Sequence, residues 1–289
     1  MFLLEDEQRR TLGWKNVFQL PVEYNVMLTP RLFDVQCTTL LPRDGEPWRR
    51  LLVIGKSGQK TAASEEILTL LLLLLLSPGA DSEAHRLHGD RMLHYFRHHR
   101  VQVTLVLLPG EESNKRYAAV DKVLEACDVF GLRRREPVVA IGGGVVLDIV
   151  GMAANLYRRG VPFIRVPTTL LSIVDASVGV KNGVDYCSCA KGLQKNRIGS
   201  FYAPIAAYAD KSFIATQDER NIINGVGEIM KLALVRSPEL FELLEVHGRR
   251  VISQRFQGDD SVADRIIHLS IEIMLEELGP NLWEHKLER

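Results

Sequence analysis

The stretch Pro137–Asp148 reads PVVAIGGGVVLD, and it decides the fold expected for the whole chain. An apolar run ends in three glycines, Gly142–Gly144, and a second apolar run follows. This pattern predicts a buried strand, a glycine turn and a helix over Val145–Arg159 that ends at Gly160. Glycines let the backbone approach an anion, and the helix start behind them offers unpaired N–H groups. The stretch therefore predicts either a phosphate cradle or a tight turn without a ligand.

Strands and helices alternate on both sides of this stretch. The alternation predicts an α/β fold with a mostly parallel sheet that is covered on both faces. Helices are expected at Asp90–His99 and Tyr117–Phe130. Strands are expected at Arg50–Gly55, Val101–Leu108 and Pro162–Val166, with weaker candidates at Val22–Leu28 and Leu32–Leu41. We expect an α/β domain over residues 1–212 and a helical domain over residues 213–289.

The composition limits the kinds of partner. With 36 basic and 36 acidic residues in 289, nothing indicates nucleic acid or an anionic membrane, so a small molecule is expected. The four cysteines are too few and too scattered for a disulfide framework, and Cys187 and Cys189 lack a second pair of metal ligands nearby. The charged opening Met1–Arg10 does not have the pattern of a cleavable signal. A reducing, cytoplasmic setting is expected.

Two further segments have unusual composition. Ile67–Leu76 is almost pure leucine, but it is shorter than the roughly 20 residues that span a bilayer. It predicts a buried helix within an insertion over about residues 56–85, with a membrane-associated segment as the alternative. His94, His98 and His99 share a helical spacing among basic neighbours, which favours a solvated face over a metal site.

Three downstream segments carry a family resemblance. They read RRGVPFIRVPTTLLSIVDASVGVKNGVDY (158–186), QKNRIGSFYAPIAAYADKSF (194–213) and ERNIINGVGEIMKLA (219–233). Together with GGGVVLD they resemble the sugar phosphate cyclases, the superfamily of dehydroquinate synthase, from about Arg100 onward. The resemblance implies a Rossmann-like sheet domain followed by a helical metal-binding domain, with NAD and a divalent metal, Zn or Co, as cofactors. It also implies a homodimer.

The resemblance assigns residues to the cofactor. Asp148 sits inside an apolar helix, where an unpaired carboxylate is costly, so a nucleotide hydroxyl or amide is one partner that it could have. Thr168 and Thr169 follow a predicted strand, where ligands bind in open α/β sheets. The residues that the resemblance implies for NAD are Glu112, Lys115, Gly143, Gly144, Val145, Asp148, Thr168, Thr169, Leu171, Asp175, Phe213 and Thr216.

The residues implied for the sugar phosphate are cations and one amide, the donors that a phosphate dianion requires. They are Arg159, Lys181, Lys195, Asn196 and Lys231, and each alone would predict a surface residue. We expected Lys181 and Arg159 to face the nicotinamide end of NAD, because they follow two of the NAD motifs.

The segment Thr216–Glu219 resembles a capping box that starts a helix carrying Glu228 and Lys231. These two residues predict either an exposed ion pair or, by resemblance, a metal ligand at Glu228. In the family, two histidines complete the metal site, in a G-H-x pattern followed by a second histidine. His247, His268 and His285 do not stand in that pattern. The sequence as written is therefore expected to lack a three-ligand metal site and to be truncated at its C-terminus.

Some motifs indicate which group of cyclases the sequence resembles most. VVLDIVGMAANLYRRG, KNRIGS and MLEELGPNLWEHKLER are similar to the 2-epi-5-epi-valiolone synthases. Met274 and Glu288 align with the Lys and Arg that bind the substrate carboxylate in dehydroquinate synthase, which implies a substrate such as sedoheptulose 7-phosphate. The implied reaction oxidises the sugar with NAD, eliminates phosphate, returns the hydride and closes the ring by an aldol step. The alternatives are 3-dehydroquinate synthase, a polyol dehydrogenase, or a metal-free NAD-binding protein that is not an enzyme.

Overall fold

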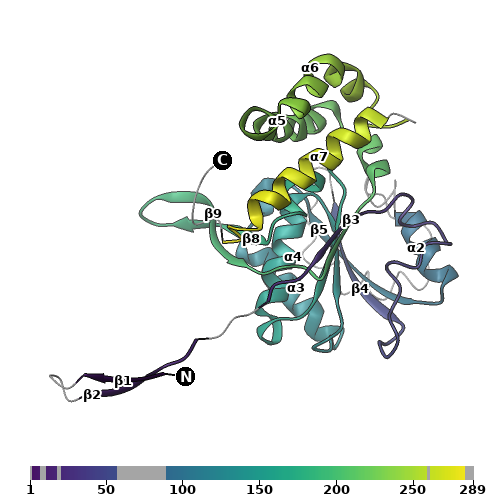
Figure 1. Ribbon diagram of the computed structural model, residues 1–289. Helices are drawn as coiled ribbons and strands as arrows, with labels where there is room; N and C mark the ends of the chain where they lie inside the picture. The colour runs from purple at the N-terminus through teal and green to yellow at the C-terminus, as the bar shows by residue number, and fades with distance from the viewer. Residues whose placement is uncertain (1, 7–10, 18–20, 57–88, 259–260, 284–289) are drawn as a thin grey trace.

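The computed structural model describes residues 2–6, 11–17, 21–56, 89–258 and 261–283 (Figure 1). Its centre is a six-stranded sheet with the order β3-β10-β7-β6-β4-β5. All five neighbouring pairs are parallel. The strands are β3 (Asn25–Leu28), β4 (Arg49–Lys56), β5 (Gln102–Pro109), β6 (Val138–Gly142), β7 (Phe163–Pro167) and β10 (Ala206–Ala209). The predicted α/β class with a mostly parallel sheet is confirmed.

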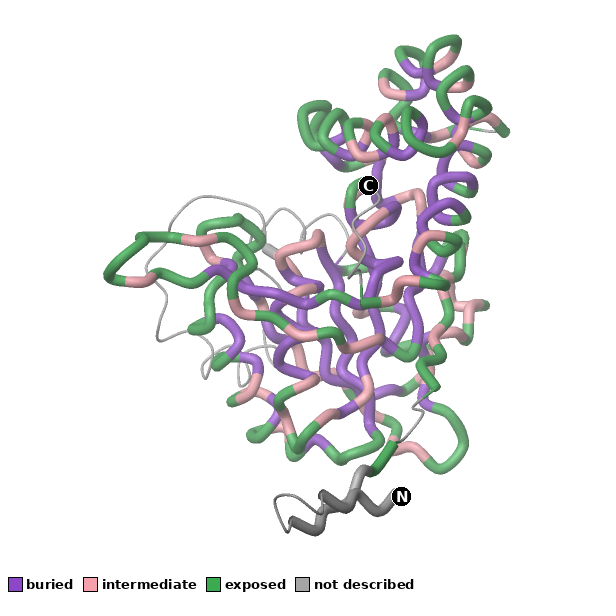
Figure 2. The backbone as a smooth tube through the Cα atoms, turned by 60° about the vertical axis from the view of Figure 1, so that its left-hand side comes forward, coloured by how far each residue is buried: buried purple, intermediate pink, exposed green. Residues whose placement is uncertain are grey.

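Helices cover both faces of the sheet because its central strands are apolar on both sides. Successive side chains of a strand point to opposite faces. In β4, Leu51 and Val53 pack with α3 (Tyr117–Val129) and α4 (Gly144–Leu156). Leu52 and Ile54 pack with α2 (Asp90–His98) on the other face. Figure 2 shows the buried strands running through the middle of this sandwich.

Two predicted elements differ in the structure. Leu32–Leu41 forms turns and not a strand. Its leucines Leu32 and Leu40 are fully buried against the sheet, so their apolar character reflects packing. The helix predicted to end at Arg159 ends at Leu156 and continues as a 3-10 turn, η3 (Tyr157–Arg159). Arg158 and Arg159 have φ of 52° and 64°, which a helix does not accommodate.

The remaining elements lie around the sheet. The hairpin β1 (Phe2–Asp6) and β2 (Thr11–Lys15) lies away from the body, and the hairpin β8 (Lys181–Ser188) and β9 (Gly192–Phe201) projects from another side (Figure 1). The chain ends in α5 (Glu219–Arg236), α6 (Pro238–Ser253) and α7 (Ser261–Leu278), with short helices η2 (Glu112–Asn114), η4 (Ser172–Ala176) and η5 (Lys211–Thr216) before them. No helix within the described residues is long and apolar enough to cross a membrane. The leucine run Ile67–Leu76 and Glu288 lie outside the described residues.

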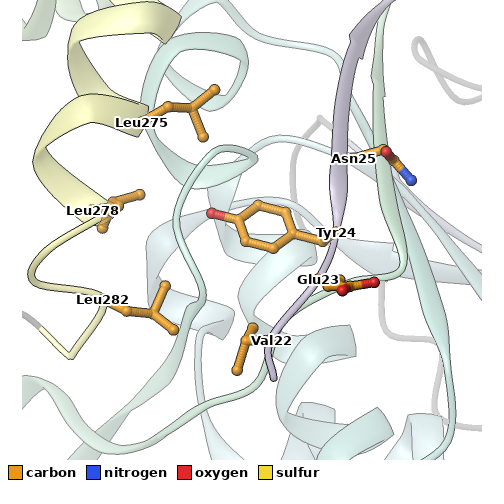
Figure 3. Close-up of a pocket in the computed structure, with 8 residues that line it drawn as sticks. Val22, Glu23, Tyr24, Asn25, Leu275, Leu278 and Leu282 are labelled. Carbon is orange, nitrogen blue, oxygen red and sulfur yellow. The ribbon is translucent and has the colours of Figure 1, made fainter. Parts of the chain in front are cut away.

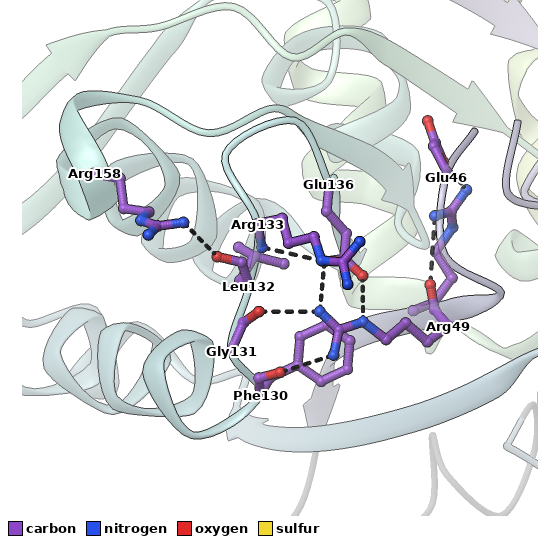
Figure 4. A network of polar contacts seen from close by, with 9 residues as sticks. Glu46, Arg49, Phe130, Gly131, Leu132, Arg133, Glu136 and Arg158 are labelled. Atoms are coloured by element: carbon purple, nitrogen blue, oxygen red, sulfur yellow. Dashed lines mark hydrogen bonds and ion pairs between the residues drawn. The ribbon is translucent and has the colours of Figure 1, made fainter. Parts of the chain in front are cut away.

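A buried ion pair ties β4 to the loop before β6 (Figure 4). Arg49 donates from Nε and Nη2 to the two carboxylate oxygens of Glu136, each at 2.8 Å. Its guanidinium also donates to the carbonyls of Phe130 and Gly131 and lies 4.3 Å above the Phe130 ring. Glu136 accepts a third bond from the Arg133 backbone N–H and is 2% exposed. The pair fixes the end of α3 against the start of the sheet.

Substitution of Glu136 by Gln tests this pair. The amide keeps the shape but removes the charge, so Arg49 is left beside a neutral group. We expect the free energy of unfolding to fall by about 2 kcal/mol in urea denaturation. The control is Glu239→Gln, because Glu239 forms the same two-pronged pair with Arg265 on the surface. Little change is expected there. Equal losses in the two variants would contradict a special role for the buried pair.

Candidate active site

The glycine turn lies at the carboxyl ends of β6 and β7. Gly142 ends β6, Gly143 is the residue before α4, and the Thr168 N–H donates to the Gly142 carbonyl at 3.0 Å. A Cβ on Gly142 would lie 2.9 Å from Val146 Cβ, and a Cβ on Gly143 would lie 3.3 Å from Thr169 Cγ2. The turn therefore has little room for side chains at Gly142 and Gly143. It leaves the N-terminus of α4 beside two threonines, which suits an anionic ligand.

Asp148, one turn into α4, has a protein partner. Lys115, which follows η2, places its Nζ 2.5 Å from Asp148 Oδ2. Lys115 is 7% exposed, so both groups are withdrawn from bulk water. Burial raises the pKa of Asp148 above its ordinary value of 3.8, and the charge of Lys115 opposes that rise. The expected requirement for a partner at Asp148 is met in the structure by Lys115, another residue assigned to NAD.

Lys115 also reaches the projecting hairpin. Its Nζ donates to Asn196 Oδ1 at 2.6 Å, so one cation joins a residue assigned to the cofactor with a residue assigned to the sugar phosphate. Asn196 is held by Asp185, whose carboxylate accepts the Asn196 backbone N–H at 2.8 Å. The sequence analysis did not identify Asp185. A buried acid between Val184 and Tyr186 in an otherwise regular strand was the signal that could have indicated it.

A buried arginine fixes the loop between η4, which contains Asp175, and β8, which begins at Lys181. Arg165 in β7 is fully buried, and burial lowers its pKa to about 10. Its guanidinium donates to the carbonyls of Ala176, Gly179 and Lys181 and to Asn182 Oδ1. The Asn182 side chain occupies the space where Gly151 of α4 lacks a Cβ. The backbone at Lys181 is therefore held by an internal network.

Other residues assigned to NAD lie near the ends of β7 and β10. Thr168 and Thr169 are half-buried, and the Thr169 hydroxyl bonds Ser172 Oγ at 2.8 Å. Leu171 is 37% exposed. Phe213 is buried, with its ring 6.2 Å from that of Phe33, so its side chain belongs to the core.

The capping-box prediction is wrong in detail. The residue that caps α5 is Asp218, whose side chain accepts the Asn221 N–H at 2.7 Å. Thr216 instead donates its hydroxyl to the Phe213 carbonyl at the end of η5. Because Thr216 is the last residue of η5, it is not the N-cap of α5, and Asp218 is the N-cap instead.

The candidate substrate cations are spread over the surface. Lys195 Nζ lies 3.1 Å from Glu112, and both side chains are well exposed. Lys231 pairs with Glu228 three residues earlier, as the spacing predicted. Arg159 follows the far end of the 13-residue α4, about 20 Å along the axis from the glycine turn. Within one chain Arg159 is therefore not brought to the cradle, contrary to the expectation that it faces the nicotinamide.

The described residues contain no group of three or more His, Cys, Asp or Glu that could hold a metal ion. Cys187 and Cys189 are exposed in the β8–β9 hairpin. Glu228 pairs with Lys231, and within the described residues it belongs to no group of three potential ligands. The described part of the chain thus supplies Glu228 as a single candidate ligand, which does not make a three-ligand site.

A cavity of about 640 Å³ lies between the beginning of β3 and the end of α7 (Figure 3). Its lining is mostly apolar, with Val22, Leu275, Leu278 and Leu282 around the Tyr24 ring. The Tyr24 hydroxyl donates to the Val178 carbonyl at 2.8 Å. β3 begins beside the start of β10, whereas the glycine turn follows the end of β6. Because no Lys or Arg among the described residues lines the cavity, we do not assign the phosphate to it.

A covered parallel sheet with a glycine turn and a helix N-terminus at the carboxyl ends of its strands defines an α/β protein that binds a phosphate-bearing ligand. A family model for the N-terminal domain of 3-dehydroquinate synthase matches residues 105–224. A 2-epi-5-epi-valiolone synthase of Actinoplanes sp. is 38% identical over 284 residues, which cover 96% of this chain and 64% of that protein. One from Actinomyces sp. is 45% identical over 214 residues, which cover 72% of this chain and 55% of that protein.

A solved structure agrees with these relatives. The 2-epi-5-epi-valiolone synthase of Streptomyces hygroscopicus subsp. jinggangensis 5008, with NAD⁺ and Zn²⁺ bound, aligns with a TM-score of 0.78 and 37% identity, over 96% of this chain and 67% of that one. The chain belongs to the sugar phosphate cyclase superfamily. It spans 55% and 64% of the length of the two curated relatives. A 2-deoxy-scyllo-inosose synthase, 20% identical with a TM-score of 0.60, supports the fold alone.

Substitution of Gly151 by Ala tests the network around Arg165. Alanine favours a helix over glycine by about 1 kcal/mol, but a Cβ on Gly151 would lie 1.7 Å from Asn182 Oδ1. We expect the clash to dominate and the free energy of unfolding to fall by about 2 kcal/mol. The control is Gly248→Ala in α6, where a Cβ has no atom within 4 Å. That variant should be as stable as the wild type or more so. A stabilised Gly151→Ala would contradict the packing of Asn182.

The raised pKa of Asp148 predicts a pH dependence of stability. Above pH 3.8 the folded chain keeps a proton on Asp148 that the unfolded chain has released. The free energy of unfolding that this group contributes therefore falls as the pH rises from below 3.8 through the raised pKa. The Asp148→Asn variant lacks this titrating carboxyl. Its free energy of unfolding, relative to that of the wild type, should therefore rise as the pH rises over the same range. Urea denaturation at a series of pH values measures this difference, and a constant difference would contradict the prediction.

Proposed function

We propose that this chain binds NAD at the glycine turn and acts as a sugar phosphate cyclase of the 2-epi-5-epi-valiolone synthase type. The observation that carries the proposal is the contact of Lys115 with both Asp148 and Asn196, at the N-terminus of α4. It brings an acid, a cation and an amide together at the carboxyl end of a parallel sheet. Relatives at 38% and 45% identity bear this enzyme's name.

The residues around the turn fit a dinucleotide. The N–H groups that begin α4 would donate to the pyrophosphate, and the absence of side chains at Gly143 and Gly144 lets it approach. Asp148 and Lys115 supply an acceptor and a donor for a ribose hydroxyl or an amide. Thr168 and Thr169 add hydroxyls on the β7 side. When bound, NAD would accept a hydride from a ring alcohol and return it later, which makes the neighbouring C–H acidic for the loss of phosphate.

The proposed substrate is sedoheptulose 7-phosphate, held by Lys181, Lys195 and Asn196. A phosphate dianion is bound best by several charge-assisted donors. Of the three, Asn196 contacts Lys115 directly, and Lys195 pairs with Glu112 in η2. 3-Dehydroquinate synthase is the alternative within the superfamily. Met274, whose alignment argued against a carboxylated substrate, is buried in the helical core and lines no described site. The choice between the two substrates therefore rests on the relatives and on experiment.

The metal of the family does not fit the described residues, because they offer only Glu228. We derive no step through a metal, although solved relatives contain Zn²⁺ or Co²⁺. The other candidate function, an NAD-binding protein without the cyclase reaction, is separated from the cyclase by the phosphate-release test below. A homodimer and a cytoplasmic location belong to the first proposal through the family resemblance.

Titration with NAD, followed by quenching of tryptophan fluorescence, tests the cofactor site. We expect saturable binding by the chain. Lys115→Ala should weaken it by about tenfold or more, because Asp148 and Asn196 both lose their partner. The control is Lys122→Ala on the exposed side of α3, which should bind like the wild type. Failure of the wild-type chain to bind NAD would contradict the proposed function.

Phosphate release distinguishes the reactions. We would supply NAD, Zn²⁺ or Co²⁺, and either sedoheptulose 7-phosphate or the carboxylated heptulosonate 7-phosphate that dehydroquinate synthase uses. Release from the first substrate alone supports the valiolone-type cyclase, and release from the second supports the alternative. Bound NAD without release from either substrate, both by this chain and by one extended at its C-terminus, would contradict the cyclase and favour the NAD-binding protein.

A further inference from the structure

Asp185 lies where the β8–β9 hairpin departs from regular pairing. Val184 pairs with Ile198, but the next pair is Tyr186 with Gln194, so the register shifts at Asp185. The other edge of Asp185 is bridged to Arg116, just after Lys115. Asp185 is 6% exposed, which is unusual for an acid in a two-stranded hairpin. At this irregularity the Asp185 backbone N–H faces the loop that carries Lys115, and the carboxylate accepts from Asn196 in β9.

Asp185, Asn196 and Lys115 form a closed ring of hydrogen bonds. The Asp185 N–H donates to the Lys115 carbonyl at 2.7 Å. The Asn196 N–H donates to Asp185 Oδ1 at 2.8 Å. Lys115 Nζ donates to Asn196 Oδ1 at 2.6 Å and contacts Asp148. The ring therefore links three separate segments, the loop after η2, β8 and β9, and one of its members also contacts α4.

The conformation of Asn196 depends on this ring. Its φ is 51°, in the left-handed region that asparagine enters more readily than most residues but still at a cost. Gly183 faces it, with the Asn196 Cβ and Oδ1 3.7 Å from where a glycine Cβ would be. The charge-assisted bond that the Asn196 backbone N–H donates to Asp185 offsets this cost and holds the backbone in place. With the backbone held by Asp185, the Asn196 side-chain oxygen accepts from Lys115.

We propose that Asp185 is a positioning residue that couples NAD binding to the β8–β9 hairpin by fixing Asn196 against Lys115. The inference rests on the proposed function, because it takes Lys115 and Asp148 as cofactor residues and Asn196 as a substrate residue. Asp185 contacts neither ligand in this account. Its effect on the cofactor passes through Asn196 and Lys115, so occupancy of the cradle and the position of the hairpin are linked.

The test is a double-mutant cycle on NAD affinity. Asp185→Ala removes the acceptor, and we expect binding about tenfold weaker than in the wild type. Asn196→Ala should weaken it to a similar degree. If Asp185 acts through the Asn196 side chain, the double variant should be no weaker than the weaker single variant. Asp185→Asn keeps an acceptor oxygen and should restore binding to within about threefold of the wild type. Asp121→Ala, on the exposed side of α3, is the control.

A second measurement follows the ring directly and needs no variant. Hydrogen exchange at the Asn196 amide should be slow in the wild-type chain and slower with NAD bound. It covers the case in which Asp185→Ala does not fold. If the wild-type chain binds NAD, three results would each overturn the role of Asp185 and leave the proposed function standing. They are unchanged exchange at Asn196 on NAD binding, additive losses of affinity in the double variant, and an Asp185→Ala variant that binds NAD as well as the wild type. Wild-type chain that binds no NAD would overturn the proposed function and this inference with it.

Discussion

The contact between Lys115 and Asp148 is the interaction on which the candidate site depends. α4 is apolar nearly all round and packs against the sheet, so an acid in its second turn cannot remain solvated. A buried carboxylate without a partner is strongly unfavourable, and the segment after β5 must therefore bring a cation to it. This requirement places the η2 loop over the N-terminus of α4. The same cation then orders Asn196, and through it the hairpin.

The second constraint is the buried guanidinium of Arg165. It collects three carbonyls and one amide oxygen from the segment between η4 and β8, and Gly151 leaves space for that amide. Two cations, Lys115 and Arg165, thus organise the polar interior. Lys115 is held by Asp148 and by Asn196, 81 residues away, whereas the partners of Arg165 lie 11 to 17 residues after it. Disturbance of either network should move the residues proposed to face the ligands, even when those residues are unchanged.

The fold could be predicted largely from sequence, whereas the site could be predicted only in part. A strand, a glycine turn and a helix follow from local chemistry, and alternation then gives the parallel sheet. Lys115 and Asp148 were assigned by resemblance, but their mutual contact joins residues far apart in the sequence and has no local signal. Asp185 was missed because its role appears only with the register shift. Arg159 is close in sequence to the residues of the glycine turn, but the length of α4 separates it from them in space.

The most direct test of the central claim is a crystal structure of the chain grown with NAD. The account predicts the pyrophosphate at the N-terminus of α4, within hydrogen-bond distance of the backbone N–H groups that follow Gly143, with Asp148 or Lys115 in contact with the nucleotide. NAD bound elsewhere, for example in the apolar cavity beside Tyr24, or a cradle that stays empty while NAD binds in solution, would contradict it.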